Sequence, residues 1–528
     1  MDKKPATAKA FTDEEKWEIK ENGKYILTAM DTIGKNGDAY CTDESLFRVS
    51  KTVRPDLTKQ QFYMDKSLLL QATFLHQEGC HLYAQRTWEY EVTAAEQLAD
   101  ILKDPALPVM EIPKELRAGD ILLSEQQRKA IGLALNSRLA VILGGAGSGK
   151  TTLIEAIVHC FRGSVDSSEA YVLAAPTGKA ARNLTERTGI EARTVHGALG
   201  KVPDANFLDA VSWNHIGLVV VDGASMVSLE MLAGILNRVR RNCRVVLLGD
   251  PNQLMSVGAG NVLSDLLTLG VPSIFLEQQY RQSADAAALR QNVAAFPKLS
   301  DERELQWDDR FRLLSADSKI IPDLLCEEAA RRYRAGESIQ VLSPVKTKTD
   351  FSVQALNTRL QNEVNPLTAE KQTWGKFRDG DRVMVTQNNA HYGVCNGDVG
   401  VLHLRGKKPH RVAALSVRGT LKTWQIDCME KYGAANDDAP PPRLALAYAL
   451  TVHKSQGSQY DAILMPVSMA TAKMLYRNLL YTAISRAGRE VILVGNREAV
   501  NTAMQCIPYP RKSKLVARTN LLRLGRSA

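Results

Sequence analysis

The sequence predicts an α/β protein with two parallel-sheet domains, a small all-β barrel inserted into the second, and a helical domain ahead of the first. Three observations support this prediction. Apolar, β-branched runs alternate with helical stretches from residue 121 to 296, which is typical of a parallel sheet covered by helices. The same pattern begins near residue 338 and resumes near 434. Over 371–433, short strands separated by Asn-Gly and Asp-Gly turns indicate the barrel.

The composition is that of a globular chain with several folded units. At 528 residues the chain exceeds the length at which single cores stop growing, so we expect three or four units. Hydrophobic residues make up 45% and charged residues 24%, which excludes a disordered or collagen-like chain. The formal net charge of +9 favours a polyanionic partner such as DNA or RNA. No apolar run approaches the roughly 20 residues that span a bilayer, so we expect a cytoplasmic protein without a membrane partner.

The first 113 residues have a different hydrophobic pattern from the rest of the chain. Their pattern is helical with two strand-like pieces, one of them at 79–92, and it predicts a small winged-helix-type domain over 1–113. The stretch 104–120 contains three prolines and a glycine, which interrupt a helix and mark a domain boundary. We therefore expect the first parallel-sheet domain over 114–296. The units predicted after it are 297–370 and 434–528 for the second parallel-sheet domain and 371–433 for the barrel.

The most specific motif follows the apolar run 139–144. Residues 144–151 read GGAGSGKT and match the pattern GxxxxGK[ST]. Glycines in such a loop let backbone N–H groups surround a phosphate, the Lys150 ammonium is placed against the β and γ oxygens, and the Thr151 hydroxyl ligates Mg²⁺. The sequence therefore predicts a site for ATP and Mg²⁺. The residues predicted to hold the nucleotide are Gln127, Gly144, Gly145, Ala146, Gly147, Ser148, Gly149, Lys150, Thr151 and Thr152.

Three polar residues outside the loop are further candidates. Gln127 has an amide that can pair with the adenine edge, but Ser124 and Gln127 also fit a helix-capping box. Asp222 ends a buried apolar run and is predicted to hold Mg²⁺ directly or through water. Gln253 follows a second such run, which ends at Asp250, and is predicted to sense the γ-phosphate; the alternative is an ordinary Gly-Asp-Pro-Asn turn.

These motifs, with five further ones in the same order, resemble the RecD-like group of superfamily 1 helicases over roughly residues 120–520. The further motifs are APTGKAARNL (175–184), TVHGALG (194–200), LEQQYRQ (276–282), LALAYALTVHKSQGSQYD (444–461) and YRNLLYTAISRAGR (476–489). The resemblance implies two RecA-like motor domains with an SH3-like barrel. It also implies an ATP-dependent DNA helicase that moves 5′ to 3′ on single-stranded DNA. The partners implied are single-stranded DNA and single-strand/duplex junctions, and we expect a monomer.

The resemblance also assigns roles to individual residues. The catalytic set that it implies is Lys150, Asp222, Gln253, Arg281 and Arg486. Arginine suits the transferred phosphate because a guanidinium pairs bidentately with phosphate oxygens and keeps its charge. The nucleic-acid set is Pro176, Thr177, His196, Thr451, His453, Lys454, Ser455 and Gln456. For the basic stretches 238–244 and 511–526, contact with phosphates and packing against the motor both remain open.

The stretch 197–215 is too short for a large accessory domain. A short ribbon or pin is what the sequence predicts there. Trp213 or Phe207 would stack on a base at its tip, and packing in the protein interior is the alternative.

Position 223 departs from the pattern of the family. RecD-like enzymes carry DEAS where this sequence reads Asp222-Gly223-Ala224-Ser225, so the glutamate expected to orient and deprotonate the attacking water is missing. General-base catalysis contributes roughly 10²- to 10⁴-fold in rate. The sequence therefore leaves two functions open: a motor that hydrolyses ATP, and a hydrolysis-impaired, ATP-gated clamp or scaffold on single-stranded DNA. A small-molecule kinase is disfavoured, because it does not need two α/β halves with paired arginines.

Overall fold

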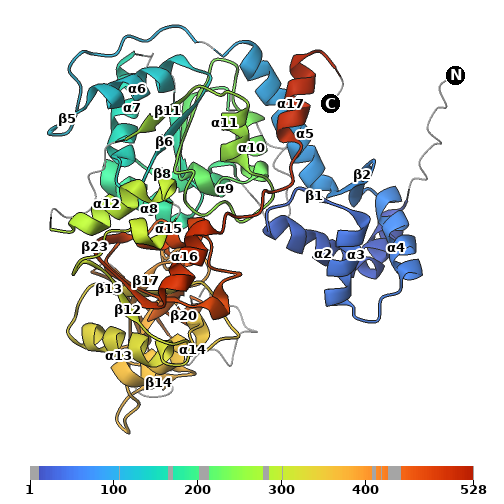
Figure 1. Cartoon of the computed structure of the whole chain (residues 1–528). Helices are drawn as coiled ribbons and strands as arrows, with labels where there is room; N and C mark the ends of the chain where they lie inside the picture. The colour runs from blue at the N-terminus through green and yellow to red at the C-terminus, as the bar shows by residue number, and fades with distance from the viewer. Residues whose placement is uncertain are drawn as a thin grey trace.

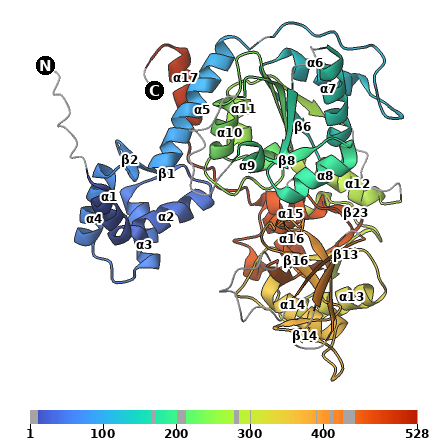
Figure 2. The same cartoon turned by 180° about the vertical axis from the view of Figure 1, so that it is seen from behind.

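The computed structural model contains a helical N-terminal domain beside two stacked sheet domains (Figure 1). Figures 1 and 2 show that the two sheet domains meet near α8 (Gly178–Thr188) and α15 (Arg477–Ile484). Within the described residues, no helix is long and apolar enough to cross a membrane. The structure describes residues 11–105, 107–164, 170–200, 213–277, 285–299, 301–389, 391–406, 412–417, 419–425 and 442–526.

The N-terminal domain packs helices against a small sheet of order β1-β3-β2. Its elements are α1 (Asp13–Asn22), α2 (Lys24–Lys35), β1 (Tyr40–Cys41), α3 (Asp43–Val53), α4 (Lys59–Gln71), β2 (Leu75–Glu78), β3 (His81–Ala84) and α5 (Gln85–Lys103). The stretch predicted as strand-like at 79–92 is a strand only in β3. Helix α5 starts directly after it, because Tyr90, Ala94 and Leu98 recur at helical spacing on its buried face. The winged-helix-type assignment of this domain stays a prediction.

The described part of the first sheet domain has a parallel sheet of order β11-β6-β10-β9-β7-β8. Its strands are β6 (Leu139–Gly144), β7 (Ala170–Ala175), β8 (Ala192–Thr194), β9 (Ile216–Asp222), β10 (Arg244–Gly249) and β11 (Ser273–Leu276). Its helices are α6 (Glu125–Asn136), α7 (Lys150–Ser164), α8, α9 (Val195–Ala198), α10 (Leu229–Leu236) and α11 (Val262–Thr268). Because parallel strands share one direction, the carboxyl ends of β6, β9 and β10 lie at one edge, where such sheets bind ligands.

The second sheet domain has a parallel sheet of order β12-β23-β22-β13-β21. Its strands are β12 (Phe311–Ser315), β13 (Ile339–Ser343), β21 (Ala449–Thr451), β22 (Tyr460–Val467) and β23 (Ala487–Gly495). Its helices are α12 (Ala287–Ala295), α13 (Ile321–Arg334), α14 (Val353–Val364), α15 and α16 (Arg497–Gln505). The predicted domain boundary at 296 lies too late, because Leu289 and Val293 of α12 pack in one core with Met465 and Leu493 of the second sheet.

The inserted unit is an antiparallel sheet of order β19-β18-β17-β16-β20, with a separate hairpin β14-β15. Its strands are β14 (Thr373–Trp374), β15 (Phe377–Arg378), β16 (Arg382–Val385), β17 (Val399–Arg405), β18 (Val412–Val417), β19 (Thr420–Gln425) and β20 (Leu444–Leu446). Strand β20 lies beyond the predicted boundary at 433. It joins the barrel because Leu446 and Leu444 pair with Val383 and Val385 of β16.

The C-terminal strap, residues 507–526, leaves the second domain, to which the sequence assigned it. It ends in α17 (Leu515–Arg523), which lies beside α5 in both views of the ribbon (Figures 1 and 2). Leu515 is fully buried in one core with Leu98 of α5 and Leu266 of the first domain. The assignment of 434–528 to the second domain is therefore wrong for this strap, which returns to the first domain and the N-terminal domain.

Candidate nucleotide site and nucleic-acid surface

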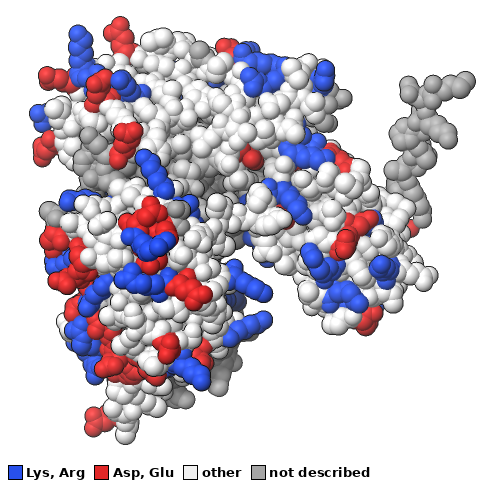
Figure 3. Space-filling view, viewed as in Figure 1, with Lys and Arg blue, Asp and Glu red and all other residues white. Residues whose placement is uncertain are grey.

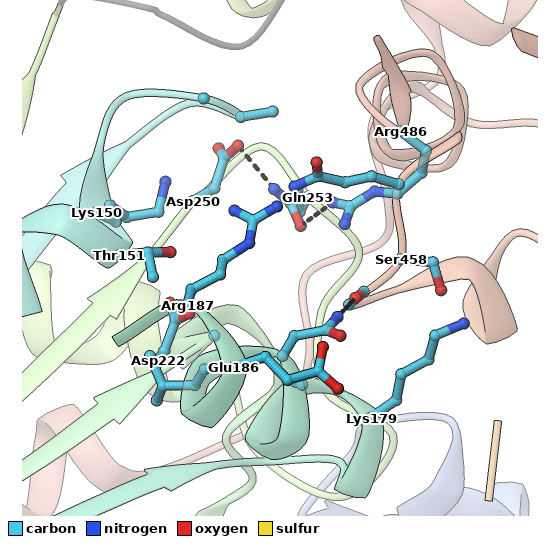
Figure 4. A pocket seen from close by; sticks show the side chains of 18 of the residues that line it. Lys150, Thr151, Lys179, Glu186, Arg187, Asp222, Asp250, Gln253, Ser458 and Arg486 are labelled. Carbon is cyan, nitrogen blue, oxygen red and sulfur yellow. Dashed lines mark hydrogen bonds between the residues drawn. The ribbon is translucent and has the colours of Figure 1, made fainter. Parts of the chain in front are cut away.

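A cavity of about 750 Å³ lies where the two sheet domains meet. The first domain contributes the loop after β6, residues 146–152, together with Asp222 and Asp250 at the ends of β9 and β10. The second domain contributes Arg486, between α15 and β23, and the loop 457–460. Figure 4 shows that these side chains converge from both domains. The cavity therefore joins the predicted nucleotide loop to the predicted arginine of the other domain.

The loop between β6 and α7 has the geometry of a phosphate cradle. Gly147 and Gly149 have positive φ angles of 83° and 81°, which side-chain-bearing residues rarely adopt. A Cβ on Gly144 would lie 2.3 Å from the Ser148 Oγ, so only glycine fits there. The Lys150 ammonium lies over the loop and donates to the carbonyl oxygens of Gly144 at 2.6 Å and Gly145 at 2.8 Å. The loop thus brings the Lys150 ammonium close to glycine backbone in the left-handed conformation, and this arrangement suits a phosphate group.

Gly223 lies in the left-handed region, with φ 88° and ψ 38°. Its N–H donates to the Leu248 carbonyl of the neighbouring strand at 2.9 Å. A Cβ here would lie 3.2 Å from the Met226 Cε and 3.4 Å from the Pro176 Cδ. Position 223 lines the cavity beside Asp222 but brings no carboxylate, and its backbone conformation suits glycine.

A polar network joins the two domains across the cavity. The Gln253 amide donates to Asp250 Oδ2 at 3.1 Å and accepts from Arg486 Nη2 at 2.6 Å. The Tyr481 hydroxyl, which we did not predict, donates to the same Asp250 oxygen at 2.9 Å. Burial lowers the pKa of the Arg486 guanidinium below its usual value, although the carboxylate of Asp250 opposes this. The structure therefore brings together Gln253 and Arg486, which are far apart in the sequence.

Gln127, Gly144 and Gly145 were predicted to hold the nucleotide but are not among the residues that line the cavity. The Gln127 side chain accepts from the Ser124 N–H at 2.9 Å, and the Ser124 hydroxyl accepts from the Gln127 N–H at 3.2 Å. The capping box is thus formed, and a contact of Gln127 with adenine stays a prediction. Arg281, predicted to reach the γ-phosphate, lies outside the described residues, as does Phe207.

The predicted nucleic-acid residues come from both domains. Pro176 and Thr177 follow β7, and the Thr177 hydroxyl caps α8 by accepting from the Ala180 N–H at 3.2 Å. The other predicted residues on this surface are His196 on α9, Thr451 at the end of β21, and His453 and Lys454, which are exposed. Partial burial and the nearby charge of Lys346 lower the pKa of Lys454, so two lysines lie close together at this edge.

Ser455 and Gln456 do not face solvent. Ser455 is fully buried and its hydroxyl donates to the Val452 carbonyl at 2.7 Å. The Gln456 amide donates to the Leu254 carbonyl of the first domain at 3.3 Å. In this structure the Ser455 side chain holds its own loop and the Gln456 side chain ties that loop to the first domain, and their contact with nucleic acid stays a prediction.

Six residues of α8 line the cavity, and the sequence reasoning missed the four polar ones among them: Lys179, Asn183, Glu186 and Arg187. Asn183 donates its amide hydrogen to the Gly457 carbonyl of the second domain. The spacing of Ala180, Asn183, Leu184 and Arg187, which places them on one face of a helix, was the available signal.

Several arginines of the basic stretches are packed, and of the predicted pin, residues 201–212 lie outside the described part of the chain. Arg238 and Arg244 are buried and donate to backbone carbonyls, among them Leu199 and Leu135. Arg511 of the strap donates to Ser256, Gly258 and Gly260. Trp213 is partly buried against the first-domain core. On the face shown in Figure 3, basic and acidic side chains are interspersed over the second sheet domain, so net charge alone does not locate a nucleic-acid surface.

Three families match successive parts of the chain. Residues 122–311 match the family described as AAA domain. Residues 356–413 match the ATP-dependent RecD-like DNA helicase SH3 domain, and residues 446–494 match the UvrD-like helicase C-terminal domain. The order of the three matches follows the order of the two sheet domains and the inserted barrel.

Relatives match over most of this chain. It is 34% identical over 414 residues to the ATP-dependent RecD2 DNA helicase of Deinococcus radiodurans. The matched stretch covers 74% of this chain and 53% of that relative. It is 30% identical over 478 residues to the RecBCD enzyme subunit RecD of Mycolicibacterium smegmatis, which covers 83% of this chain and 82% of the relative. The chain thus spans about half the length of the first relative. A solved Pif1 helicase from Candida albicans is 18% identical, with a TM-score of 0.44, and covers 77% of this chain and 100% of its own.

Proposed function

Because the chain belongs to the RecD-like superfamily 1 DNA helicases, we propose that it is an ATP-dependent DNA helicase that moves 5′ to 3′ along single-stranded DNA. One observation carries the proposal: Lys150 from the first sheet domain and Arg486 from the second line one cavity. A nucleotide held between two domains couples its hydrolysis to their relative movement. This is the arrangement that a translocating motor requires.

ATP fits the residues of the cavity. Its phosphates would be held by the glycine cradle and Lys150, and Mg²⁺ would be held by Thr151 and Asp222, both of which line the cavity. Mg²⁺ supplies neutralisation of the phosphate charge during transfer. Arg486 would supply a further cation from the opposite domain, and Gln253 would report whether the γ-phosphate is present, which its hydrogen bonds with both Asp250 and Arg486 support.

The nucleic acid is proposed to run across both domains. Thr177 and His196 would hold the strand on the first domain, and Thr451, His453 and Lys454 on the second. Binding of ATP favours the closed cleft, and loss of the γ-phosphate favours the open one. If the two domains grip the strand with different strength in these states, each cycle moves the chain along it.

Gly223 favours a second candidate function, an ATP-gated single-stranded DNA clamp that hydrolyses slowly. The cavity keeps the groups that bind phosphate but has no side chain at position 223 to deprotonate water. The two candidates differ in turnover and agree in nucleotide binding.

The test is steady-state ATP hydrolysis with and without single-stranded DNA, followed by unwinding of partial duplexes that carry a 5′ or a 3′ tail. The motor predicts DNA-stimulated hydrolysis that falls at least ~100-fold in Lys150→Ala, and unwinding of the 5′-tailed duplex alone. Unwinding of the 3′-tailed duplex alone would contradict the proposed polarity. ATP-dependent DNA binding without turnover would favour the clamp.

Gly223→Glu and Gly223→Gln form the matched pair for the missing base. Both side chains meet the same left-handed backbone, which costs about 1–2 kcal/mol, so they differ mainly in the carboxylate. If the carboxylate is what the site lacks, Gly223→Glu raises the DNA-stimulated rate by about 100-fold over Gly223→Gln. Equal rates in the two variants would show that another group activates the water.

A further inference from the structure

Helix α8 presents one face to the nucleotide cavity. Ala180, Asn183, Leu184 and Arg187 share this face and all line the cavity. At its beginning the face is packed: a Cβ on Gly457 of the second domain would lie 3.3 Å from the Ala180 Cβ, and the Asn183 amide donates to the Gly457 carbonyl. The other end of the face carries Arg187 and opens into the cavity.

Arg187 extends across the cavity rather than along its own helix. In Figure 4 its guanidinium lies on the side of Asp250 and Gln253. The side chain is exposed, and within the described part of the chain it has neither a hydrogen bond nor an ion pair. By contrast, the neighbouring Arg182 on α8 is paired with the buried Asp398 at 2.7 Å. The two arginines of one helix are thus used differently.

The charges around Arg187 suit an anion. The basic side chains that line the cavity are Lys150, Lys179, Arg187, Arg382 and Arg486, and the acidic ones are Glu186, Asp222, Asp250 and Asp398. Asp398 is paired with Arg182, whereas Asp250 accepts from the neutral Gln253 amide and Tyr481 hydroxyl and keeps its charge. Position 223, where a carboxylate would add negative charge, is glycine. The cavity lining therefore carries more basic than acidic side chains, and one of the acids, Asp398, is already paired with Arg182.

We propose that Arg187 binds the terminal phosphate of the bound nucleotide and so makes this site prefer a nucleoside triphosphate over a diphosphate. The proposal rests on the proposed function, namely that the cavity holds ATP. Lys150 lies over the loop that follows β6. Arg187 points instead toward the part of the cavity that contains Gln253, where Arg486 also lies (Figure 4). A guanidinium suits this position, because its planar fork pairs with two phosphate oxygens at once.

The test is the affinity of the full chain for the β,γ-imido analogue of ATP and for ADP, both with Mg²⁺, measured by titration calorimetry. Arg187→Gln is expected to weaken binding of the triphosphate analogue by about 10- to 100-fold, as loss of a hydrogen-bonded charge does, and that of ADP by less than about 3-fold. The matched control is Arg193→Gln: Arg193 follows α8 on β8, is 65% exposed and pairs with Glu191, outside the cavity. The control variant is expected to bind both nucleotides as the unchanged chain does.

The outcomes separate this inference from the proposed function. An equal loss of affinity for both nucleotides, or no loss for either, overturns the role of Arg187 as long as the unchanged chain binds ATP and Lys150→Ala does not. Weaker binding of single-stranded DNA by Arg187→Gln, with unchanged nucleotide affinity, also overturns it and makes Arg187 a DNA contact. If the unchanged chain binds neither nucleotide, the proposed function itself fails.

Discussion

Two buried arginines, one in the strap and one in the cleft, differ in what balances their charge. Arg518 on α17 is 3% exposed and donates to the carboxylates of Glu78 at 2.5 Å and Glu91 at 3.1 Å. Arg486 in the cleft is 6% exposed and donates to the Gln253 amide oxygen and to the Thr482 carbonyl. No carboxylate of the described residues accepts a hydrogen bond from it.

The pKa values of the two guanidinium groups follow this difference. Burial lowers the pKa of Arg486, and no direct carboxylate bond restores it. Burial also acts to lower the pKa of Arg518, but the hydrogen bonds with Glu78, Tyr83 and Glu91 raise it overall. Removing one partner of a buried ion pair is strongly destabilising, whereas a buried cation whose hydrogen-bond acceptors are all neutral is a candidate for binding an incoming anion. The comparison therefore indicates a structural role for Arg518 and supports the proposed contact of Arg486 with a phosphate.

The largest expected effect is on stability, at the strap. Arg518→Met leaves Glu91, which is fully buried, without its cation and is expected to lower the free energy of unfolding by about 3–5 kcal/mol. Arg523→Met, on the exposed side of the same helix, is expected to change it by less than about 0.5 kcal/mol. Urea unfolding of the three proteins measures this. Equal stability of the two variants would contradict the structural role of Arg518.

At the cleft the expected effect is on rate. Arg486→Met is expected to lower DNA-stimulated ATP hydrolysis by about 100-fold, since one cation to the transferred phosphate is lost. Its stability is expected to stay equal or to rise slightly, because a buried charge without a carboxylate partner is removed. Arg489→Met, exposed and three residues further on, is the control. The contrast between the two arginines would be contradicted if Arg486→Met unfolded as readily as Arg518→Met and hydrolysed ATP at the unchanged rate.

Local sequence signals predicted the parts of the site that depend on short segments. The loop 144–151 follows a strand and starts a helix, as its glycines and Lys150 indicate. The apolar runs before Asp222 and Asp250 are strands, as predicted, and the structure shows that these strands, β9 and β10, are neighbours. These features depend on local backbone conformation, which glycines and runs of apolar residues encode directly.

The features that the sequence reasoning missed depend on contacts between distant segments. The Lys512 N–H donates to Asp38, which lies 474 residues earlier, and no local pattern in 511–526 distinguishes this docking from an exposed basic tail. Ser455 and Gln456 lie in a motif that suggested nucleic acid, but their burial is decided by how the loop packs on Leu254 of the other domain. Polar side chains alone do not reveal whether a neighbouring domain covers them.

The smallest expected effect is the pH dependence of stability at Asp265, whose pKa responds to the charge of Glu91. Burial, and then the charge of Glu91, raise the pKa of Asp265 from 3.8 to about 6. The folded protein thus holds this proton more tightly than the unfolded chain, so the stability it contributes is present below pH 3.8 and is lost as pH rises through about 6. Asp265→Asn is therefore expected to stabilise the protein by about 1–2 kcal/mol at pH 8, by roughly half of that at pH 5 and by almost nothing below pH 3.8, as urea unfolding measures. Asp309→Asn, at an exposed position, should show no such pH dependence. A gain from Asp265→Asn that is equal at pH 8 and pH 5 would contradict the raised pKa of Asp265.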